Sequence, residues 1–419
     1  MPAGFHLLIA AQFASALADN ALLIVTIALL QEQGLPGWWA PMLKLGFTVS
    51  YVVLAPFVGP LADAFPKARL MAWMNGVKVV GVLALLAGLH PVAAFVIVGL
   101  GAAAYAPAKY GLVTELVTPQ QLVAANGWVE VSVVCAALLG TVVGGVLVSP
   151  WLLVSPLSAG GPPLLARLGM QGGSGLSTSM LLLLGLYAAA AVLNIGVPDS
   201  GARYSAGRIH PGALAREFWA ANLTLWRDRD GGLSLAVTTI FWGVGATLQF
   251  AVLRWAADVL HLPLNQSAYL QAAVAIGVMI GAAAAGRWIA LEHSKRVLSA
   301  GIGLGLLMPL VASASTLALA VPLLTLVGAV GGILVVPLNA LLQHRGCTLL
   351  SAGRSIAVQG FNENASVLAM LTTYALLIAL DVSIVSLLWG LGLSIAAAIA
   401  LLQWRERCRV RCESAGATR

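Results

Sequence analysis

The chain has 419 residues, of which 60% are hydrophobic and only 9% are charged, and it carries a formal net charge of +7. Its mean hydropathy is +0.94. Ordinary soluble domains carry about 25% charged residues, so this composition excludes a typical soluble enzyme or nucleic-acid-binding domain. It indicates an integral membrane protein.

Apolar segments recur along nearly the whole sequence. A helix needs about 20 such residues to cross the hydrocarbon core of a bilayer. The segments therefore predict an all-α integral membrane fold with twelve transmembrane helices, at residues 6–30, 41–62, 69–89, 92–116, 127–150, 178–197, 233–257, 267–290, 296–314, 319–343, 355–380 and 382–404.

The first segment has a second interpretation as a cleaved signal peptide, because small residues at 14–18 resemble a signal-peptidase site. However, no Lys or Arg precedes this site, and the apolar run continues for ten residues past Asn20. We therefore expect the first helix to be retained.

Basic residues indicate the orientation, because Lys and Arg accumulate in short cytoplasmic loops. Most of the 22 Lys and Arg residues fall on one side if the N-terminus is cytoplasmic. We therefore predict that both termini are cytoplasmic and interpret the positive net charge as a topology signal, with attraction to anionic lipid headgroups as a secondary effect.

The sequence divides into two halves of six predicted helices each. We predict an N-terminal bundle at 1–197, a cytoplasmic central loop at 198–232, a C-terminal bundle at 233–404 and a basic cytoplasmic tail at 405–419. The start of the fifth helix in each half reads amide, glycine, aromatic, any residue, glutamate, at 126–130 and 359–363. Such parallel repeats are typical of one large class of secondary transporters.

Charged and polar residues inside the predicted helices mark the candidate site. A carboxylate at the bilayer centre costs roughly 2.5 to 3.5 kcal/mol, so Asp19 must face water, a partner or a ligand. Gln12 lies seven residues before it, on the same helical face. We expect this face to line a cavity in which Asp19 receives an ammonium or a coupling cation. A structural hydrogen bond to a neighbouring helix is the alternative, for which Asn20 is the stronger candidate.

Three basic residues in predicted helices are candidates for binding an anionic group: Lys78, Lys109 next to Tyr110, and Arg254. Arg binds phosphate in a bidentate manner, whereas Lys acts as a point charge. For the two lysines the alternative is an internal ion pair with Asp19 or Glu115.

Two glutamates, Glu130 and Glu363, begin the fifth helix of each half. They are candidates for the translocation path. Equally, each carboxylate can simply stabilise the positive end of its helix dipole.

Sequence motifs for catalysis are absent. The six histidines are scattered without the paired spacing of a metal site, and no nucleophile motif or phosphate-binding Gly-rich loop occurs. We predict that the chain is not an enzyme and needs no cofactor or metal.

The predicted loop after the second helix contains Gly59, Asp63, Lys67 and Arg69. This spacing resembles the loop motif of the major facilitator superfamily. Asp63 can cap a helix N-terminus and pair with the basic residues, so we expect the motif to act as a conformational latch at the inward ends of the helices. The alternative is a capped turn with cytoplasmic positive charge. The corresponding second-half segment, from Gly281 to 295–296, lacks the acidic residue, which predicts a weaker latch there.

Seven stretches spread over nearly the whole chain carry a more specific resemblance: AQFASALADNALL, APFVGPLAD, GAAAYAPAKYG, ANGWVEVS, FWGVGATLQF, GILVVPLNALLQ and SIAVQGFNENAS. They resemble the bacterial LplT-type lysophospholipid transporters, a branch of that superfamily. The resemblance implies uptake of lysophosphatidylethanolamine and lysophosphatidylglycerol across the bacterial inner membrane, for reacylation by an acyltransferase on the cytoplasmic side. The partners that it implies are the lysophospholipid substrate, membrane lipids and a functional link to this acyltransferase, with no nucleic acid, and a monomer is one of the oligomeric states left open.

The chain departs from that branch at Gln249, where the relatives carry a basic residue. Arg254 follows five residues later, so either the headgroup contact is shifted outward or Arg254 only marks the helix end. The loop at 156–177 is also longer than usual. An alternative function for the same fold is proton-coupled efflux of amphipathic drugs, with Asp19 or Glu363 as the titrating carboxylate.

Overall fold

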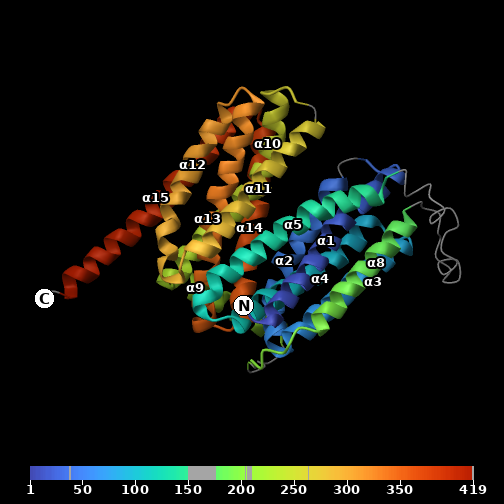
Figure 1. Cartoon of the computed structure of the whole chain (residues 1–419), viewed down its shortest axis with the longest axis horizontal. Coiled ribbons are helices and arrows are strands. Elements are labelled where there is room, and N and C mark those ends of the chain that lie inside the picture. The colour runs from blue at the N-terminus through green and yellow to red at the C-terminus, as the bar shows by residue number, and fades with distance from the viewer. Residues whose placement is uncertain (37–38, 150–175, 203, 205–209, 263, 418–419) are drawn as a thin grey trace. The chain divides into compact units, whose positions relative to one another are not determined.

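The structure is a computed structural model that describes residues 1–36, 39–149, 176–202, 204, 210–262 and 264–417. Within these residues all regular structure is helical (Figure 1). The predicted all-α fold is therefore confirmed. The long loop predicted at 156–177 lies almost entirely outside the described residues.

The first half of the chain forms long helices, and short turns join the first five of them. A proline lies in or directly after each of these turns, where it does not continue the preceding helix easily. The helices are α1 (Ala3–Glu32), α2 (Trp39–Ala64), α3 (Lys67–Leu86), α4 (Pro91–Leu116), the 3₁₀ turn η1 (Pro119–Gln121), α5 (Leu122–Leu147) and α8 (Ser177–Ile195).

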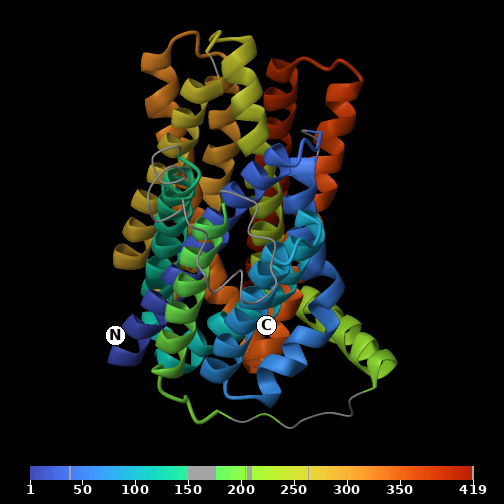
Figure 2. The ribbon, with the colours of Figure 1, turned by 90° about the vertical axis from the view of Figure 1, so that its right-hand side faces the viewer.

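The second half begins inside the predicted central loop. There α9 (Pro211–Arg227) runs obliquely to the spanning helices of the first half (Figure 2). The remaining elements are α10 (Arg229–Asp258), α11 (Leu264–Trp288), η2 (Leu291–Val297), α12 (Leu298–Ala312), α13 (Leu317–Leu349), α14 (Ala352–Ala379) and α15 (Ile384–Ala417). The last helix continues through most of the segment predicted as a tail.

Eleven helical segments in the described residues are long and apolar enough to cross a membrane. The sequence predicted twelve. The difference is α14, which is a 28-residue helix at the predicted position but is not among the eleven. Its inner portion is too polar, because Gln359, Asn362, Glu363 and Asn364 occur within six residues.

The chain folds into two compact units. Unit 1 comprises Met1–Thr118, Ser132–Thr224 and Gly346–Asn364, and unit 2 comprises Pro119–Val131, Leu225–Arg345 and Ala365–Arg419. The first turns of α5 therefore belong to unit 2, and the first turns of α14 belong to unit 1. These are the two segments that carry the repeated pentad, so the internal repeat has a structural counterpart.

Unit 1 is held by an apolar core between α1, α2, α3, α4 and α8. Leu22, Val82, Val98 and Leu183 are buried in it. Small residues allow the helices to approach: a Cβ on Gly99 of α4 would lie 3.0 Å from the Cα of Phe47 in α2. This packing brings polar positions of different helices within hydrogen-bonding distance.

Unit 2 has a separate core around Trp255, whose indole nitrogen donates a hydrogen bond to the carbonyl of Ala312 at 3.3 Å. Its helices α11 and α13 meet through four glycines spaced four apart, at 277, 281, 328 and 332. A Cβ at any of them would collide with the backbone of the opposite helix. Such small-residue pairs are typical of helix packing in membranes, where dispersion contacts replace the hydrophobic effect.

Candidate functional site

A buried ion pair occupies the interior of unit 1. The Nζ atom of Lys78, on α3, lies 2.6 Å from Oδ2 of Asp19, on α1. Lys78 is only 1% exposed. The other carboxylate oxygen of Asp19 accepts a hydrogen bond of 2.7 Å from the hydroxyl of Tyr187, on α8. Of the alternatives that the sequence left open for Lys78, the structure shows the internal pair with Asp19.

The pair continues into a hydrogen-bonded network between α1 and α3. Lys78 donates to the hydroxyl of Ser15 at 2.9 Å, and this hydroxyl donates to the side chain of Asn75 at 2.8 Å. Ser15 precedes Asp19 by one turn on α1, and Asn75 precedes Lys78 by about one turn on α3. Each of the two facing helices therefore contributes two polar side chains to the network. The ammonium group also lies 5.1 Å from the ring centroid of Tyr105.

The other polar residues predicted on α1 have different partners. Gln12 is buried and donates a 2.7 Å hydrogen bond to Ser132 of α5. Asn20 donates to the backbone carbonyl of Ala16 at 2.8 Å, within its own helix. A neighbouring-helix hydrogen bond was the alternative that the sequence favoured for Asn20, but the bond shown here is intrahelical.

The second buried lysine lies apart from this network. Lys109, on α4, is buried, and its Nζ atom lies 4.1 Å from the ring centroid of Tyr110. The sequence allowed Glu115 as its partner, but Glu115 pairs with Lys67 instead, at 2.6 Å. The role of Lys109 in the translocation path therefore stays a prediction.

The two glutamates of the repeated pentad lie in different units. Glu363 accepts a hydrogen bond of 2.8 Å from Gln359, one turn earlier on α14, in unit 1. Glu130 is buried at the start of α5, in unit 2. Near it, the side-chain amides of Asn126 and Gln343 exchange two hydrogen bonds of 2.8 and 2.9 Å. The sequence did not identify Gln343.

Unit 2 contains an apolar pocket between α10, α11, α12 and α13. Gln249 lies at this pocket together with Gln271, whose side-chain nitrogen donates a hydrogen bond to the backbone carbonyl of Gln249. The walls are otherwise apolar, and include Phe241, Leu248 and Val278. Sequence reasoning missed this combination of two amides and an apolar wall, because it joins residues of four helices.

Arg254 is placed differently from the other candidates. Its Nε atom lies 3.3 Å from Oδ2 of Asp258, one turn later on α10, and both side chains are about half exposed. It does not line the apolar pocket of unit 2. This arrangement favours the interpretation of Arg254 as a marker of the helix end.

The loop motif of unit 1 binds the first turn of α14. Oδ1 of Asp63 accepts a 2.9 Å hydrogen bond from the backbone amide of Gly353, and Oδ2 accepts one from the hydroxyl of Ser351. Gly59 makes this possible, because a Cβ at that position would lie 3.0 Å from the Cα of Arg354. A carboxylate beside free backbone amides at a helix N-terminus is stabilised by hydrogen bonding and by the helix dipole.

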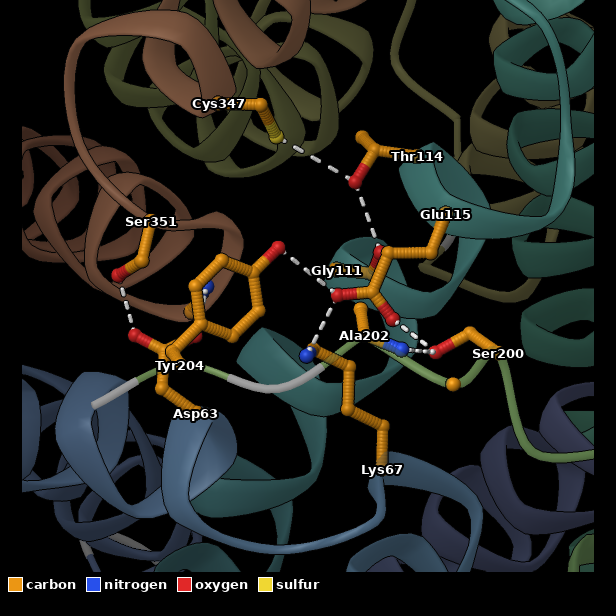
Figure 3. Close-up of polar contacts among 12 residues, drawn as sticks. Asp63, Lys67, Gly111, Thr114, Glu115, Ser200, Ala202, Tyr204, Cys347 and Ser351 are labelled. Carbon is orange, nitrogen blue, oxygen red and sulfur yellow. Dashed lines mark hydrogen bonds and ion pairs between the residues drawn. The ribbon is translucent and has the colours of Figure 1, made fainter. Parts of the chain in front are cut away.

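The basic part of the motif is engaged separately, as Figure 3 shows. Lys67 is paired with Glu115 of α4, which also accepts hydrogen bonds from Ser200 at 2.5 Å and from Tyr204 at 3.1 Å. Burial, followed by the negative charge of Glu115, raises the pKa of Tyr204. Arg69 is exposed. The sequence predicted that Asp63 caps a helix, but it did not identify Glu115 as the partner of the motif lysine.

Unit 2 has its own ionic cluster, for which the sequence predicted only a weak latch. Lys295 contacts Asp230 and lies 2.8 Å from Oε1 of Glu406, which Arg229 also approaches, at 3.0 Å. The missing acidic residue is therefore supplied by α10 and α15. Distance along the sequence conceals this pairing.

The N-cap residue of α10 is another acidic residue of unit 2, Asp228. Asp228 accepts a hydrogen bond of 2.8 Å from the amide of Gly231 and binds Arg345 through two nitrogens, at 3.1 and 2.6 Å. The hydrogen bond from Arg345 is the main reason that the pKa of Asp228 lies below its usual value. The lowered pKa extends the ionised range of Asp228 to more acidic pH than for an ordinary aspartate.

The transmembrane helices, the internal repeat and the loop motif define a transporter built from two related halves. The family model of the Major Facilitator Superfamily matches residues 8–371. The chain belongs to this superfamily, and the prediction that it is a secondary transporter and not an enzyme is confirmed.

Particular relatives are similar over nearly the whole length. A protein of Citrobacter koseri named Lysophospholipid transporter LplT is 41% identical over 96% of both chains. A protein of the same name from Yersinia enterocolitica is 41% identical over 91% of this chain and 89% of its own. The resemblance predicted from the sequence is thereby confirmed.

Solved structures share the fold at low sequence identity. The human organic anion transporter MFSD10 has a TM-score of 0.74 at 14% identity and covers 96% of this chain and 99% of its own. The fucose:proton symporter of Escherichia coli has a TM-score of 0.71 at 17% identity over 95% and 97% of the two chains. At this level of identity these matches support the fold alone.

The Asp19–Lys78 pair generates the first testable prediction. Removing one partner of a buried ion pair leaves an uncompensated charge, which costs about 3 to 5 kcal/mol. We expect Asp19→Asn and Lys78→Met each to lower the thermal unfolding temperature in detergent. The double variant should be more stable than the sum of the two losses implies. Additive losses in this double-mutant cycle would contradict an energetic coupling of the two side chains.

Proposed function

We propose that this transporter moves lysophospholipids, such as lysophosphatidylethanolamine and lysophosphatidylglycerol, across the bacterial inner membrane to its cytoplasmic side. The observation that carries the proposal is the 41% identity, over 96% of both chains, to a relative named as a lysophospholipid transporter. The distribution of Lys and Arg supports an orientation with both termini in the cytoplasm. An acyltransferase on that side would consume the transported lipid.

The buried network of unit 1 supports recognition of the headgroup. A lysophosphatidylethanolamine headgroup carries a phosphate anion and an ammonium cation, and Asp19 and Lys78 present the opposite charges 2.6 Å apart. Binding would exchange the internal pair for two charge-assisted contacts, phosphate with Lys78 and ammonium with Asp19. The charges therefore stay compensated before and after binding.

The apolar pocket of unit 2 supports a contact with the acyl chain. Gln249 and Gln271 present polar groups at a pocket that is otherwise lined by apolar side chains. An acyl chain gains little by leaving lipid for an apolar wall, so such a contact would orient the substrate more than it would add affinity. We infer that Gln249 serves at this pocket in place of the basic residue expected in relatives.

We further propose that Asp63 holds the first turn of α14 in one state of the transport cycle. The cap on Ser351 and Gly353 joins the end of α2 to a helix of the second half of the sequence. Alternating access in this class of transporter requires such contacts to form and break. Asp63, together with Gly59, Lys67 and Arg69, is thus our candidate latch.

Uptake of labelled lysophosphatidylethanolamine by spheroplasts that lack their own lysolipid transporter tests the function directly. We expect uptake to depend on this protein and to fall at least about tenfold in Asp19→Asn, since a hydrogen bond to a charged group contributes about 1.5 to 3 kcal/mol. Thr141→Val is the control, because Thr141 bonds to the carbonyl of Ala137 on an exposed face of α5. Absence of uptake, with export of cationic amphiphiles driven by a proton gradient, would reassign the protein to drug efflux.

Filling the pocket of unit 2 tests the acyl-chain contact. Gly245 lies at the pocket, and a Cβ there would meet no atom within 4 Å, so Gly245→Leu fills open space without a collision. We expect the maximal uptake rate of a long-chain lysolipid to fall several-fold with little change in its KM, because the filled pocket no longer orients the acyl chain, which loses no affinity relative to lipid. A short-chain analogue should be affected less.

Gly303→Leu on α12 is the matched control, since a Cβ at Gly303 also meets no atom within 4 Å and Gly303 does not line the pocket. Equal effects of Gly245→Leu on the long-chain and short-chain substrates would contradict an acyl-chain role for the pocket.

Alkylation of Cys347 tests the latch. Cys347 lies within the first-unit segment Gly346–Asn364, and its thiol lies 3.4 Å from the hydroxyl of Thr114 on α4. With Cys135, Cys408 and Cys412 replaced by Ser, we expect Asp63→Ala to accelerate labelling of Cys347 by an impermeant maleimide in everted vesicles. Asp63→Asn retains a hydrogen-bond acceptor and should label at an intermediate rate. Unchanged labelling in Asp63→Ala would rule out the cap as a latch.

A further inference from the structure

The helix α9 of the central segment has one face packed on protein. Phe218, Ala221 and Leu225 are buried. Asn222 accepts a 2.8 Å hydrogen bond from the side chain of Asn362, at the beginning of α14. On the other side of this packed face, α9 makes a charged contact.

That contact is an ion pair with α14. Oε2 of Glu217 lies 2.8 Å from Nη2 of Arg354. The ring of Phe361 also lies 5.3 Å from Phe218 and 5.4 Å from Trp219, in edge-to-face geometry. Within unit 1, α9 therefore packs against the first turns of α14, and Asp63 caps the N-terminus of the same helix.

A second face of α9 is exposed and apolar. Trp219, Leu223 and Trp226 are 51%, 51% and 40% exposed. At about 100° per residue they fall within an arc of roughly 60° on the helix surface. The exposed Arg216 and Arg227 lie about 20° and 40° beyond the Leu223 edge of this arc. A soluble surface rarely presents two tryptophans and a leucine in one stripe, so the stripe needs an occupant.

The position of α9 in the chain indicates what that occupant is. The 17-residue α9 is too short to span a bilayer, yet it follows the spanning helix α8 and precedes the spanning helix α10. It is thus tethered at both ends to the membrane surface. Tryptophans gather at the headgroup level of bilayers, and arginines beside an apolar stripe attract anionic lipids. Both the length and the charge of α9 match a lipid surface.

We propose that α9 is an in-plane membrane helix that inserts Trp219, Leu223 and Trp226 among anionic phospholipids of the cytoplasmic leaflet and thereby steadies the first turns of α14. The leaflet assignment rests on the orientation proposed above. Since α9 holds Asn362 and Arg354, lipid binding on its outer face restrains the helix on its inner face. The anionic lipid content of the membrane then sets how firmly α14 is held.

The test places a reporter on the full-length protein reconstituted in vesicles of phosphatidylcholine with added phosphatidylglycerol. In a background with all four cysteines replaced by Ser, Leu223→Cys carries an environment-sensitive fluorophore. Thr224→Cys is the matched control, because its side chain is exposed about 100° around the helix from Leu223. Spin-labelled lipid should quench the label at 223, and aqueous iodide should quench the label at 224.

Two outcomes would overturn the proposal. A label at 223 that iodide quenches as readily as the label at 224 would place this face in water. A label at 223 that neither quencher reaches would place it against protein. Neither result depends on the transported substrate, so a failure of lysolipid uptake in the earlier experiment would leave this proposal standing.

The anionic component is tested with Arg216→Gln and Arg227→Gln in the Leu223→Cys protein. We expect the phosphatidylglycerol fraction that gives half-maximal lipid quenching to rise, by up to about fivefold for each arginine removed. Glutamine preserves helix propensity, and gel filtration checks that the protein is folded. Quenching that is independent of phosphatidylglycerol in the parent protein, or unaltered by both substitutions, would overturn the assignment of an anionic partner.

Discussion

The absence of water from the bilayer core is the constraint on which this structure depends. A buried charge in hydrocarbon must find its partner within the protein, so Asp19 and Lys78 determine how α1 and α3 lie against each other. Ser15 and Asn75 extend the same arrangement by one turn. The ion pair therefore stabilises the packing of α1 against α3. A substrate that separates the two side chains must supply both missing charges.

The same constraint explains why the repeated pentads matter. The beginnings of α5 and α14 are the polar ends of membrane helices, and each needs partners that its own half of the sequence does not supply. Asn126 exchanges two hydrogen bonds with Gln343 in unit 2, and Gly353 is capped by Asp63 in unit 1. The fifth helix of each half is thus the one that changes unit along its length, which suits a protein whose halves must alternate between two arrangements.

The sequence predicted the helices well because hydropathy and length alone decide whether a segment crosses a bilayer. It also offered an ion pair between Asp19 and Lys78 as one alternative, since charges in apolar runs stand out, and it offered Asp63 as a helix cap. It could not predict that Lys67 pairs with Glu115, or that Lys295 pairs with Glu406, because these partners come together only in the folded protein. The apolar pocket of unit 2 was missed for the same reason, as no single helix carries its pattern.

Among the long helices in the described residues, α14 alone is not apolar enough to be identified as a membrane span. α14 is too polar in its first turns to be held in a membrane by hydrophobicity, so its position depends on the specific partners of its polar groups. Asp63 caps its N-terminus, Glu217 pairs with Arg354, and Asn222 bonds to Asn362. Contacts of this kind exchange at modest cost, whereas burial of an apolar helix does not reverse readily. A helix placed by exchangeable contacts is therefore the element best suited to move during transport.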